Sequence, residues 1–394
     1  MSTRVLLDGN GAASIGLKLA QVKVISAYPI TPQSPISEKL ADYVVDGSLK
    51  AKYIRVESEH SAMSCAIGAQ LTGVRAGTAT SSVGLALMHE VLGVAAGCRI
   101  PIVMPVVNRS LVAPWSLWCD HQDAMAERDG GWMQLYAESA QEVLDLILIA
   151  YRTAEDARVL LPTMVCLDGF FLSHMSDTVH VPEQATVDSF MPPYTCHNVR
   201  LDPDDPMFIN DLTPTAEFTE MRFQQAVAFE NAFDVLEEAM ADFKKVFGRE
   251  YSLIEAYQCE DAEAVIVTLG SMSGTGKYVV DKMRAQGKKV GILKITSFRP
   301  FPAEQIKKAL ANVVIVGVMD RSAGLGAEVG PVATEVRAAL SGKPVQGFIG
   351  GLAGRDLSPV TFEKAFNQLL NNEFTNKVEW IDVREDALTI REVK

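Results

Sequence analysis

Short, uninterrupted apolar runs alternate with stretches of helical pattern through most of this 394-residue chain. In the first half, the runs of strand length occupy residues 22–26, 53–56, 77–80, 100–107 and 163–167. Strands that are apolar on both faces and separated by helices are typical of a parallel sheet covered by helices on both sides. We therefore expect an α/β fold, with a first open, mostly parallel domain over residues 1–178.

The alternation stops after residue 178 and resumes near residue 256. Residues 179–212 are rich in proline, and we expect this proline density to exclude a regular helix or a central strand. Apolar residues then recur at helical spacing from residue 215 to Gly248, a typical C-terminal cap. We interpret residues 179–255 as a linker with one long amphipathic helix, packed against a partner surface or a domain.

The remaining residues, 256–394, predict a second open α/β domain. Strands are expected at residues 264–269, 290–295 and 313–319, and helices at residues 277–286, 303–311 and 361–370.

The glycine-rich segment Gly270-Ser-Met-Ser-Gly-Thr-Gly-Lys277 follows a predicted strand and opens a predicted helix, as a phosphate-binding loop does. Five residues separate its first glycine from Gly276-Lys277, where a P-loop has four, and Tyr278 replaces the magnesium-binding hydroxyl. We expect a structural turn rather than a nucleotide site, with anion contact at the helix N-terminus as the alternative.

Charge and cysteine spacing exclude several classes of protein. With 49 acidic and 36 basic residues the net charge is −13, which disfavours nucleic acid as a partner. The closest cysteines, Cys98 and Cys119, are 21 residues apart, so no CxxC pair indicates a zinc or iron–sulfur site, and we expect no metal bound by this chain. Without a signal-peptide pattern or an uncharged stretch of about 18 residues, we expect a cytoplasmic protein with no membrane contact.

Polar groups follow three predicted strands. A hydroxyl lies in Tyr28-Pro-Ile-Thr-Pro-Gln33, carboxylates in Arg55-Val-Glu-Ser-Glu59, and a guanidinium in Val106-Val-Asn-Arg109. Ligands of open α/β sheets bind beyond the carboxyl ends of the strands. These three segments therefore predict a site that binds an acid and transfers protons.

Cys119-Asp-His-Gln-Asp123 contains a possible cluster of metal ligands, Asp120, His121 and Asp123. No further ligand follows at a recognisable spacing, and an isolated Asp–His pair is more often a hydrogen-bonded brace. We favour the brace.

Six segments, in order along most of the chain, resemble the α subunits of the 2-oxoacid:ferredoxin oxidoreductases, the family that includes pyruvate synthase. The matching segments are Tyr28-Pro-Ile-Thr-Pro-Gln33, Val56-Glu-Ser-Glu-His-Ser-Ala-Met63, Met104-Pro-Val-Val-Asn-Arg109, Asp120-His-Gln-Asp-Ala-Met125, Leu167-Asp-Gly-Phe170 and Phe298-Arg-Pro-Phe-Pro302. The resemblance implies a thiamine diphosphate enzyme divided among several chains. Its first domain would resemble the pyrimidine-binding domain of thiamine enzymes, and its second the last domain of transketolase.

The resemblance also implies roles for individual residues. Glu59 matches the activating glutamate, whose carboxylate favours the imino tautomer of the pyrimidine ring so that the ring can deprotonate the thiazolium. Glu57 is the competing candidate, and the plainer interpretation of Glu59 is an acid at a helix N-terminus. Thr31 and Arg109 match positions that hold the carboxylate of the 2-oxo acid.

Four more residues are expected beside the cofactor from the same resemblance: Pro29, Ser82, Val83 and Gly84. The chain has no Gly-Asp-Gly segment, with which thiamine enzymes hold the magnesium diphosphate. Magnesium and the diphosphate are therefore expected in a β subunit, and [4Fe-4S] clusters in a ferredoxin-like subunit. A γ subunit, coenzyme A as co-substrate, ferredoxin as acceptor and a dimer of heteromers complete the expected assembly.

The expected reaction is the oxidative decarboxylation of a 2-oxo acid, most frequently pyruvate in this family, to its acyl-coenzyme A. The segment Pro114-Trp-Ser-Leu117 stands where the resemblance implies Pro-Ile-Asn-Ile in relatives that use pyruvate. Trp115 is either an ordinary packing residue or part of a pocket for an aryl or branched substrate (phenylglyoxylate, 2-oxoisovalerate), with NAD as the final acceptor. Two other classes are a non-catalytic scaffold subunit and a self-contained transketolase-like enzyme. Retention of Thr31, Glu59 and Arg109 opposes the first, and the missing diphosphate motif opposes the second.

Overall fold

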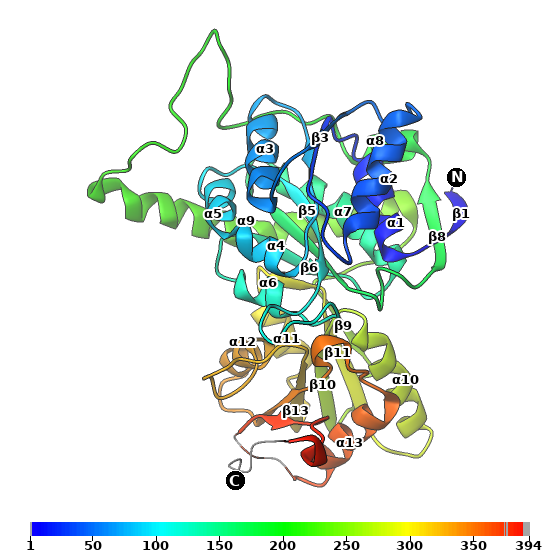
Figure 1. Ribbon diagram of the computed structural model, residues 1–394. Helices are drawn as coiled ribbons and strands as arrows, with labels where there is room; N and C mark the ends of the chain where they lie inside the picture. The colour runs from blue at the N-terminus through cyan, green and yellow to red at the C-terminus, as the bar shows by residue number, and fades with distance from the viewer. Residues whose placement is uncertain (1, 374, 376, 389–394) are drawn as a thin grey trace. The chain divides into compact units, whose positions relative to one another are not determined.

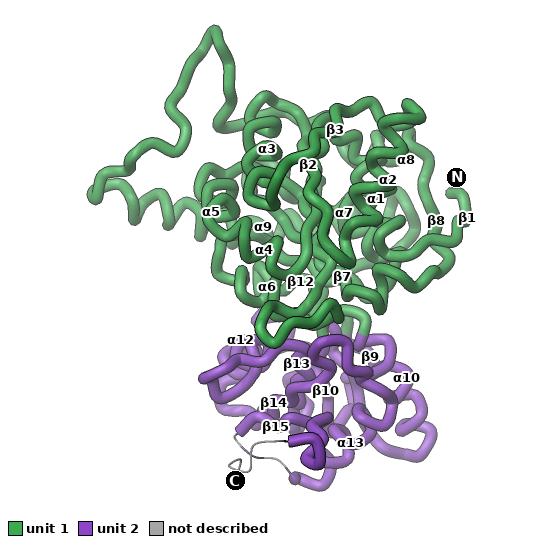
Figure 2. The backbone as a smooth tube through the Cα atoms, in the orientation of Figure 1, with its two compact units in different colours: residues 1–255, 269–271, 295–302 green, residues 256–268, 272–294, 303–394 purple. Residues whose placement is uncertain are grey.

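The computed structural model describes residues 2–373, 375 and 377–388, which form two compact units (Figure 1, Figure 2). Unit 1 comprises residues 1–255, 269–271 and 295–302, and unit 2 comprises residues 256–268, 272–294 and 303–394. The helix-bearing segment that follows residue 178 thus groups with unit 1. The division of the chain into folding domains at residues 178 and 255 stays a prediction.

The sheet of unit 1 has seven strands: β2 (Val24–Ala27), β3 (Lys52–Arg55), β4 (Ala76–Gly77), β5 (Val103–Asn108), β6 (Met133–Tyr136), β7 (Thr163–Asp168) and β12 (Ser297–Arg299). Their spatial order is β12-β6-β7-β5-β4-β2-β3. All neighbours are parallel except β12, which is antiparallel to β6. Every residue of β5, β6 and β7 is buried, as expected for strands covered on both faces. The predicted parallel α/β sheet is confirmed.

The helices of unit 1 are α1 (Gly9–Leu19), α2 (Ser34–Val45), α3 (Glu59–Leu71), α4 (Ser82–Leu87), α5 (His89–Gly97), α6 (Gln122–Ala126), α7 (Ala140–Ala154), α8 (Gln184–Phe190) and α9 (Thr215–Phe247). Helices α1, α2 and α7 pack together on one face of the sheet, and α3, α4 and α5 lie toward the other (Figure 1). Gly16 of α1 permits a close approach, because a Cβ there would lie 3.1 Å from the Ile147 side chain of α7.

The proline-rich segment contains more regular structure than predicted. Strand β8 (Asp177–Pro182) pairs antiparallel with β1 (Ser2–Leu7) in a separate two-stranded sheet, and α8 follows it. The expectation that prolines exclude a helix here is wrong, since Pro182 ends the strand and α8 fits between it and Pro192.

Helix α9 begins at Thr215 as predicted and ends at Phe247, where Gly248 adopts the left-handed conformation with φ of 76°. Val235, Leu236 and Met240, in its second half, are buried in the core that α7 also lines. Residues 215–224 are all exposed.

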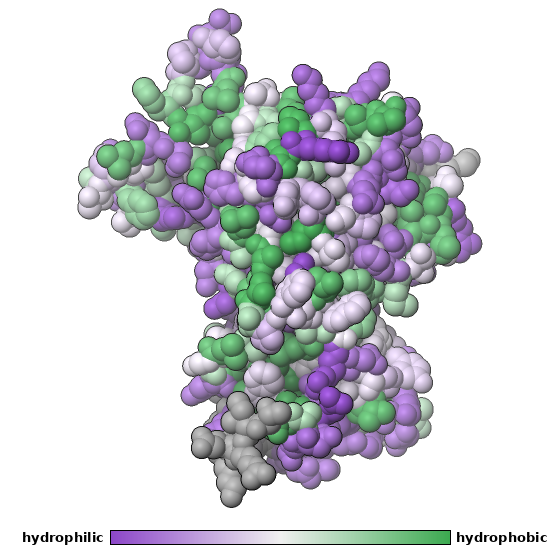
Figure 3. All heavy atoms as spheres, viewed as in Figure 1, coloured by the Kyte–Doolittle hydropathy of each residue, from purple (hydrophilic) through white to green (hydrophobic). Residues whose placement is uncertain are grey.

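The exposed start of α9 continues an exposed apolar stretch in the segment that precedes it, and Figure 3 shows hydrophobic side chains over this projecting part. The large exposed apolar residues in it are Leu201, Met207, Phe208, Leu212, Phe218, Met221 and Phe223. Exposed apolar stretches of this kind are typical of surfaces that contact another protein.

A buried ion pair fixes the segment after α7. Arg75, 7% exposed, donates two hydrogen bonds of 2.7 Å to the Glu155 carboxylate and further bonds to the carbonyls of Ala20 and Pro192. We predict that Glu155→Ala lowers the free energy of unfolding by about 3–5 kcal/mol, because it leaves a buried guanidinium without its carboxylate. Unfolding by guanidinium chloride, followed by tryptophan fluorescence, measures this free energy. Trp132 reports on unit 1, because its side chain is only 1% exposed there.

The control is Asp242→Ala, which removes an ion pair with Lys245 whose side chains are 45% and 74% exposed. An exposed ion pair of this kind contributes up to about 1 kcal/mol to the free energy of unfolding. Equal losses for the two variants would contradict the proposed importance of the buried pair.

The second sheet consists of β9 (Ile254–Tyr257), β10 (Ala264–Leu269), β11 (Val290–Ile295), β13 (Ile315–Asp320), β14 (Val345–Ile349) and β15 (Glu379–Trp380), in the order β15-β14-β13-β10-β11-β9. The pairings of β10 with β13, β13 with β14 and β14 with β15 are parallel. Two pairs of helices pack in unit 2: α10 (Met272–Arg284) with α13 (Pro359–Leu370), and α11 (Ala303–Ala309) with α12 (Pro331–Ala339). The second mostly parallel α/β unit is confirmed.

Helix α10 begins five residues before the predicted start at Lys277. Its glycines belong to the helix rather than to a loop, and a Cβ on Gly276 would lie 2.6 Å from Ile292 of β11. This glycine therefore serves the close packing of helix on strand and not a phosphate.

No helix in the described ranges combines the length and the apolar character that a membrane crossing requires. The six cysteines are free thiols.

Candidate functional site

The carboxyl ends of the central strands of unit 1 meet at one edge of the sheet. Ala27 lies opposite Arg55, and Asn108 lies opposite Asp168. Thr80, after β4, forms a bridge with Val106 of β5. The three polar segments predicted to form a site therefore start from the same edge.

Glu59 is the first residue of α3, because the Ser58 side chain caps that helix by accepting a hydrogen bond from the Ser61 N–H. The Glu59 side chain is 6% exposed, and burial raises the pKa of its carboxyl. Among the described residues, no other side chain donates a hydrogen bond to this carboxylate. A buried carboxylate without such a donor is expensive for a folded protein and is typical of a functional group.

Gly84 lies directly against Glu59. A Cβ on Gly84 would be 2.6 Å from Glu59 Oε1 and 2.7 Å from Thr80 Oγ1, so only glycine fits there. The Thr80 hydroxyl is buried and has no hydrogen-bond partner in the described part of the chain. An acceptor or donor from a bound molecule would satisfy this group.

Arg109 follows β5 and is 5% exposed. Its Nη1 donates to the Thr31 carbonyl at 2.9 Å, and its Nε donates to the Ser116 carbonyl at 3.1 Å. No described residue accepts from its Nη2. Burial lowers the pKa of Arg109, and the nearby Asp123 carboxylate opposes that shift. The guanidinium is thus fixed by two carbonyls with one nitrogen left for a ligand.

The Arg109 and Glu59 regions are linked through Ser82. The Ser82 hydroxyl donates to the Ser110 carbonyl at 2.5 Å, while Gly84, two residues on, contacts Glu59. Ser82 has φ of 51°, a left-handed conformation that is strained for a residue with a side chain. Strain of this kind is often found at functional sites.

The structure brings together most of the residues predicted from the sequence. Thr31 contacts Arg109, and Gly84 contacts Glu59, with Val83 half-buried between Ser82 and Gly84. Pro29 is exposed in the loop after β2. The roles of these residues stay predictions.

The competing carboxylate, Glu57, is exposed. Its Oε1 accepts a hydrogen bond from the Ser61 hydroxyl, which lowers the pKa of Glu57. A lowered pKa makes Glu57 a weaker proton acceptor, so Glu59 is the better candidate for proton exchange.

His121 pairs with a residue that the sequence pattern did not reveal. Its Nε2 lies 2.6 Å from Asp168 Oδ1, and Asp168 Oδ2 accepts from the N–H of Ser271 at 3.0 Å and from its hydroxyl. Potential metal-ligand atoms of Cys119, His121 and Asp168 lie within 4.8 Å of one another. Because the His121 and Asp168 atoms already bond to each other and to Ser271, we interpret the cluster as a brace and assign no metal.

This contact also explains the glycine-rich segment. The Asp168 carboxylate accepts a hydrogen bond from the N–H of Ser271 in this segment, so that N–H is not available to a ligand anion. The structural-turn interpretation agrees with this geometry.

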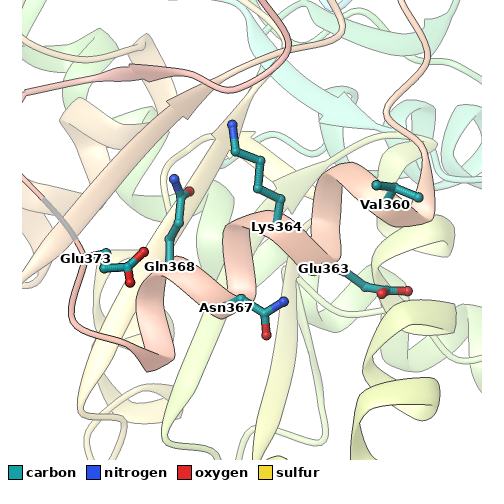
Figure 4. A pocket seen from close by; sticks show the side chains of 6 residues that line it. All are labelled: Val360, Glu363, Lys364, Asn367, Gln368 and Glu373. Atoms are coloured by element: carbon teal, nitrogen blue, oxygen red, sulfur yellow. The ribbon is translucent and has the colours of Figure 1, made fainter.

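Two hollows in the described surface lie elsewhere. One of about 460 Å³ on α13 has side chains that project in different directions, Lys364 and Gln368 to one side and Glu363 and Asn367 to the other (Figure 4). These groups already bond to neighbours, for example Gln368 Nε2 to Glu379 at 2.9 Å. A second hollow of about 720 Å³ in unit 1 is lined by Arg222 and Arg299, among others. Neither hollow includes Glu59, Thr31 or Arg109.

Solved structures share this fold. A 2-oxoglutarate:ferredoxin oxidoreductase from Magnetococcus marinus, with 2-oxoglutarate, coenzyme A and succinyl-CoA bound, superposes with a TM-score of 0.74 at 20% identity, covering 93% of this chain and 65% of that one. A split-gene transketolase superposes with a TM-score of 0.56 at 12% identity over 92% of this chain and 97% of that one. The chain therefore shares the α/β fold of these two structures.

Sequence relatives define the family more closely. Residues 15–241 match the thiamine diphosphate-binding domain of pyruvate flavodoxin/ferredoxin oxidoreductase, and residues 262–362 match core domain II of pyruvate:ferredoxin oxidoreductase. Pyruvate synthase subunit PorA of Methanothermobacter thermautotrophicus is 50% identical over 97% of this chain and 99% of that protein. The corresponding subunit of Pyrococcus furiosus is 46% identical over 98% and 99%. The α subunit of NADH-dependent phenylglyoxylate dehydrogenase from Aromatoleum evansii is 43% identical over 90% and 88%.

The chain belongs to the 2-oxoacid:ferredoxin oxidoreductase family, as an α subunit of the pyruvate synthase type. It is one subunit of an enzyme complex. The resemblance drawn from the six sequence segments is confirmed.

Proposed function

We propose that this chain is the pyrimidine-side subunit of a thiamine diphosphate-dependent pyruvate synthase. The complete enzyme converts pyruvate and coenzyme A to acetyl-coenzyme A and CO₂ and passes two electrons to ferredoxin. The observation that carries the proposal is the buried Glu59 carboxylate, which faces Gly84 and the unsatisfied Thr80 hydroxyl at the carboxyl edge of the sheet. The near full-length similarity to pyruvate synthase subunits supports it.

The residues at this edge fit the pyrimidine side of the cofactor. Gly84 has no Cβ, which lets the Glu59 carboxylate lie directly against its backbone, and the buried Thr80 hydroxyl offers a hydrogen bond that no described residue uses. When bound, thiamine diphosphate supplies the carbon nucleophile for the 2-oxo carbonyl and accepts the electron pair released with CO₂.

With the cofactor bound, Glu59 would hydrogen-bond its pyrimidine ring and would give or take a proton through its own carboxyl group. Because burial raises the pKa of its carboxyl, the group holds a proton closer to neutral pH than an exposed glutamate does. Glu59 is the first residue of α3, so the helix backbone fixes the point from which its side chain extends.

Arg109 and Thr31 bind the carboxylate of the 2-oxo acid. Two carbonyls hold the guanidinium, which leaves Nη2 to donate a charge-assisted bond, while the exposed Thr31 contributes its hydroxyl from the loop after β2.

Partner chains supply what this one does not. We propose a β subunit that holds magnesium and the diphosphate, a γ subunit, and a ferredoxin-like subunit with [4Fe-4S] clusters, assembled as a dimer of heteromers in the cytoplasm. The exposed apolar residues between Leu201 and Phe223 support the involvement of partner chains.

Purification of the native complex tests the proposal. We expect pyruvate-dependent ferredoxin reduction that requires coenzyme A, acetyl-coenzyme A as product, and thiamine diphosphate in the complex. Absence of thiamine, or a rate that does not depend on coenzyme A, would contradict the proposal. Full activity after replacement of Thr31, Glu59 and Arg109 together would favour a scaffold subunit.

A larger 2-oxo acid is the second candidate substrate. Trp115 is 71% exposed and directly precedes Ser116, whose carbonyl holds Arg109, so its ring is available to border the acyl group. The similarity to a phenylglyoxylate dehydrogenase subunit favours the same alternative, with NAD as the final acceptor.

For a pyruvate enzyme we predict that kcat/KM for pyruvate exceeds that for 2-oxoisovalerate and phenylglyoxylate by at least about 10-fold, because a pocket matched to a methyl group excludes larger ones. Trp115→Ala should narrow this ratio, whereas Trp380→Ala, at an exposed tryptophan of unit 2, should leave it unchanged. Rates on the three acids with the whole complex measure it. A wild-type preference for phenylglyoxylate would overturn pyruvate as the substrate.

A further inference from the structure

We infer that Asp123 is a positioning residue, which holds the loop beside the cofactor and the substrate-binding arginine in a common frame through one buried carboxylate. The inference rests on the function proposed above, because it concerns how Ser82 and Arg109 are placed relative to each other. No distinctive spacing in the sequence indicates this role.

Each carboxylate oxygen of Asp123 accepts two hydrogen bonds. Oδ2 accepts from the backbone N–H of Ser82 at 2.9 Å and of Arg109 at 3.0 Å. Oδ1 accepts from Asn108 Nδ2 at 2.9 Å and from the Ala124 N–H at 2.8 Å. The residue is 1% exposed, so water does not compete for these bonds.

Oδ2 is the atom that connects the two halves of the site. On one side it holds Ser82, whose left-handed backbone needs an external restraint and whose neighbour Gly84 contacts Glu59. On the other side it holds the backbone of Arg109, whose side chain reaches Thr31. A shift of this oxygen therefore moves both binding elements together.

A carboxylate at this position is costly unless it has a specific task. Burial raises the pKa of Asp123 to about 6, against the effect of its four hydrogen bonds. Only a carboxylate can accept from donors on both sides at once. An amide keeps the bonds on one side and turns its own N–H₂ toward donors on the other, so asparagine is the informative replacement.

The test uses the assembled complex with Asp123→Asn and the double variant Asp123→Asn/Asn108→Asp. Asp123→Asn leaves one acceptor oxygen for two pairs of donors, and whenever that oxygen faces Asn108 and Ala124, the N–H groups of Ser82 and Arg109 lose their acceptor. In the double variant the new carboxylate at position 108 accepts from the amide N–H₂, which keeps the amide oxygen toward Ser82 and Arg109. Asp145→Asn is the matched control, since Asp145 is fully buried in unit 1 but bonds Arg249 and Tyr251.

For Asp123→Asn we expect the apparent KM for pyruvate to rise about 10-fold, the value for one lost hydrogen bond to a charged group. The amount of thiamine diphosphate retained by the complex should fall, and the backbone amides of residues 80–87 and 106–112 should exchange their hydrogens faster. The double variant should recover part of all three properties. Asp145→Asn should lower stability without changing KM or exchange in these segments.

The two hypotheses fail in different ways. If Asp123→Asn leaves KM, thiamine retention and exchange unchanged in an active complex, or changes them only as Asp145→Asn does, Asp123 is not a positioning residue. If the wild-type complex oxidises no 2-oxo acid but Asp123→Asn still accelerates exchange in both segments, the proposed function fails and the brace stands. If Asp123→Asn does not assemble, failure of the double variant to restore assembly also overturns the inference.

Discussion

Glu59→Gln should reduce kcat of the assembled enzyme by about 10²- to 10⁴-fold, the usual contribution of a positioned acid or base. Glutamine keeps the size of the side chain and can still donate a hydrogen bond, but it cannot exchange a proton with the pyrimidine ring. The effect should fall on kcat, with KM for pyruvate and the thiamine content of the complex nearly unchanged. Steady-state kinetics and thiamine analysis on the same preparation measure all three quantities.

Glu57→Gln is the control for this result. Glu57 lies two residues earlier and is exposed, with a side chain that bonds Ser61 instead of facing the site. We expect near wild-type turnover. A normal rate in Glu59→Gln, or a large loss in Glu57→Gln, would remove Glu59 from its proposed role.

The second large effect is expected for Arg109→Met. A hydrogen bond to a charged group contributes about 1.5–3 kcal/mol, so the apparent KM for pyruvate should rise about 10- to 100-fold. Arg109→Lys should recover part of the affinity, because lysine restores the charge without the planar fork. Initial rates over a range of pyruvate concentrations give both values.

Arg4→Met, at an exposed arginine of β1, controls for a general change in charge. Its KM should match that of the wild type. An unchanged KM in Arg109→Met would contradict a role in substrate binding and leave the arginine as a structural bridge between Thr31 and Ser116.

Local pattern predicted many of the elements. Helix α9 runs over Thr215–Phe247 and β10 over Ala264–Leu269, both as expected, because a glycine cap and continuous apolar runs are encoded within a few residues. The predicted start of α10 was wrong, because Gly276, which suggests a loop, instead lies inside the helix and packs against Ile292 of β11, a contact that local pattern does not contain.

The site was predicted in part. Thr31, Glu59 and Arg109 follow strand ends, so their grouping could be inferred from the rule that parallel strands share a carboxyl edge. The partners of Asp123 and His121 could not. The partners of Asp123 depend on β4 lying beside β5, because Ser82 follows β4 and Arg109 follows β5. The partner of His121, Asp168, lies at the end of β7, which pairs with β5 and brings Asn108 opposite Asp168 across 60 residues of chain.

The sequence by itself determined the class of this protein: two α/β units, a family, and a set of polar residues at strand ends. These depend on periodicity and on short segments, which are local properties of the chain. Only the tertiary structure decided that Glu59 is buried beside Gly84 while Glu57 is exposed, and that one carboxylate, Asp123, bonds both Ser82 and Arg109. Burial and hydrogen-bond partners depend on which strands are neighbours, and strand order is a property of the whole folded chain.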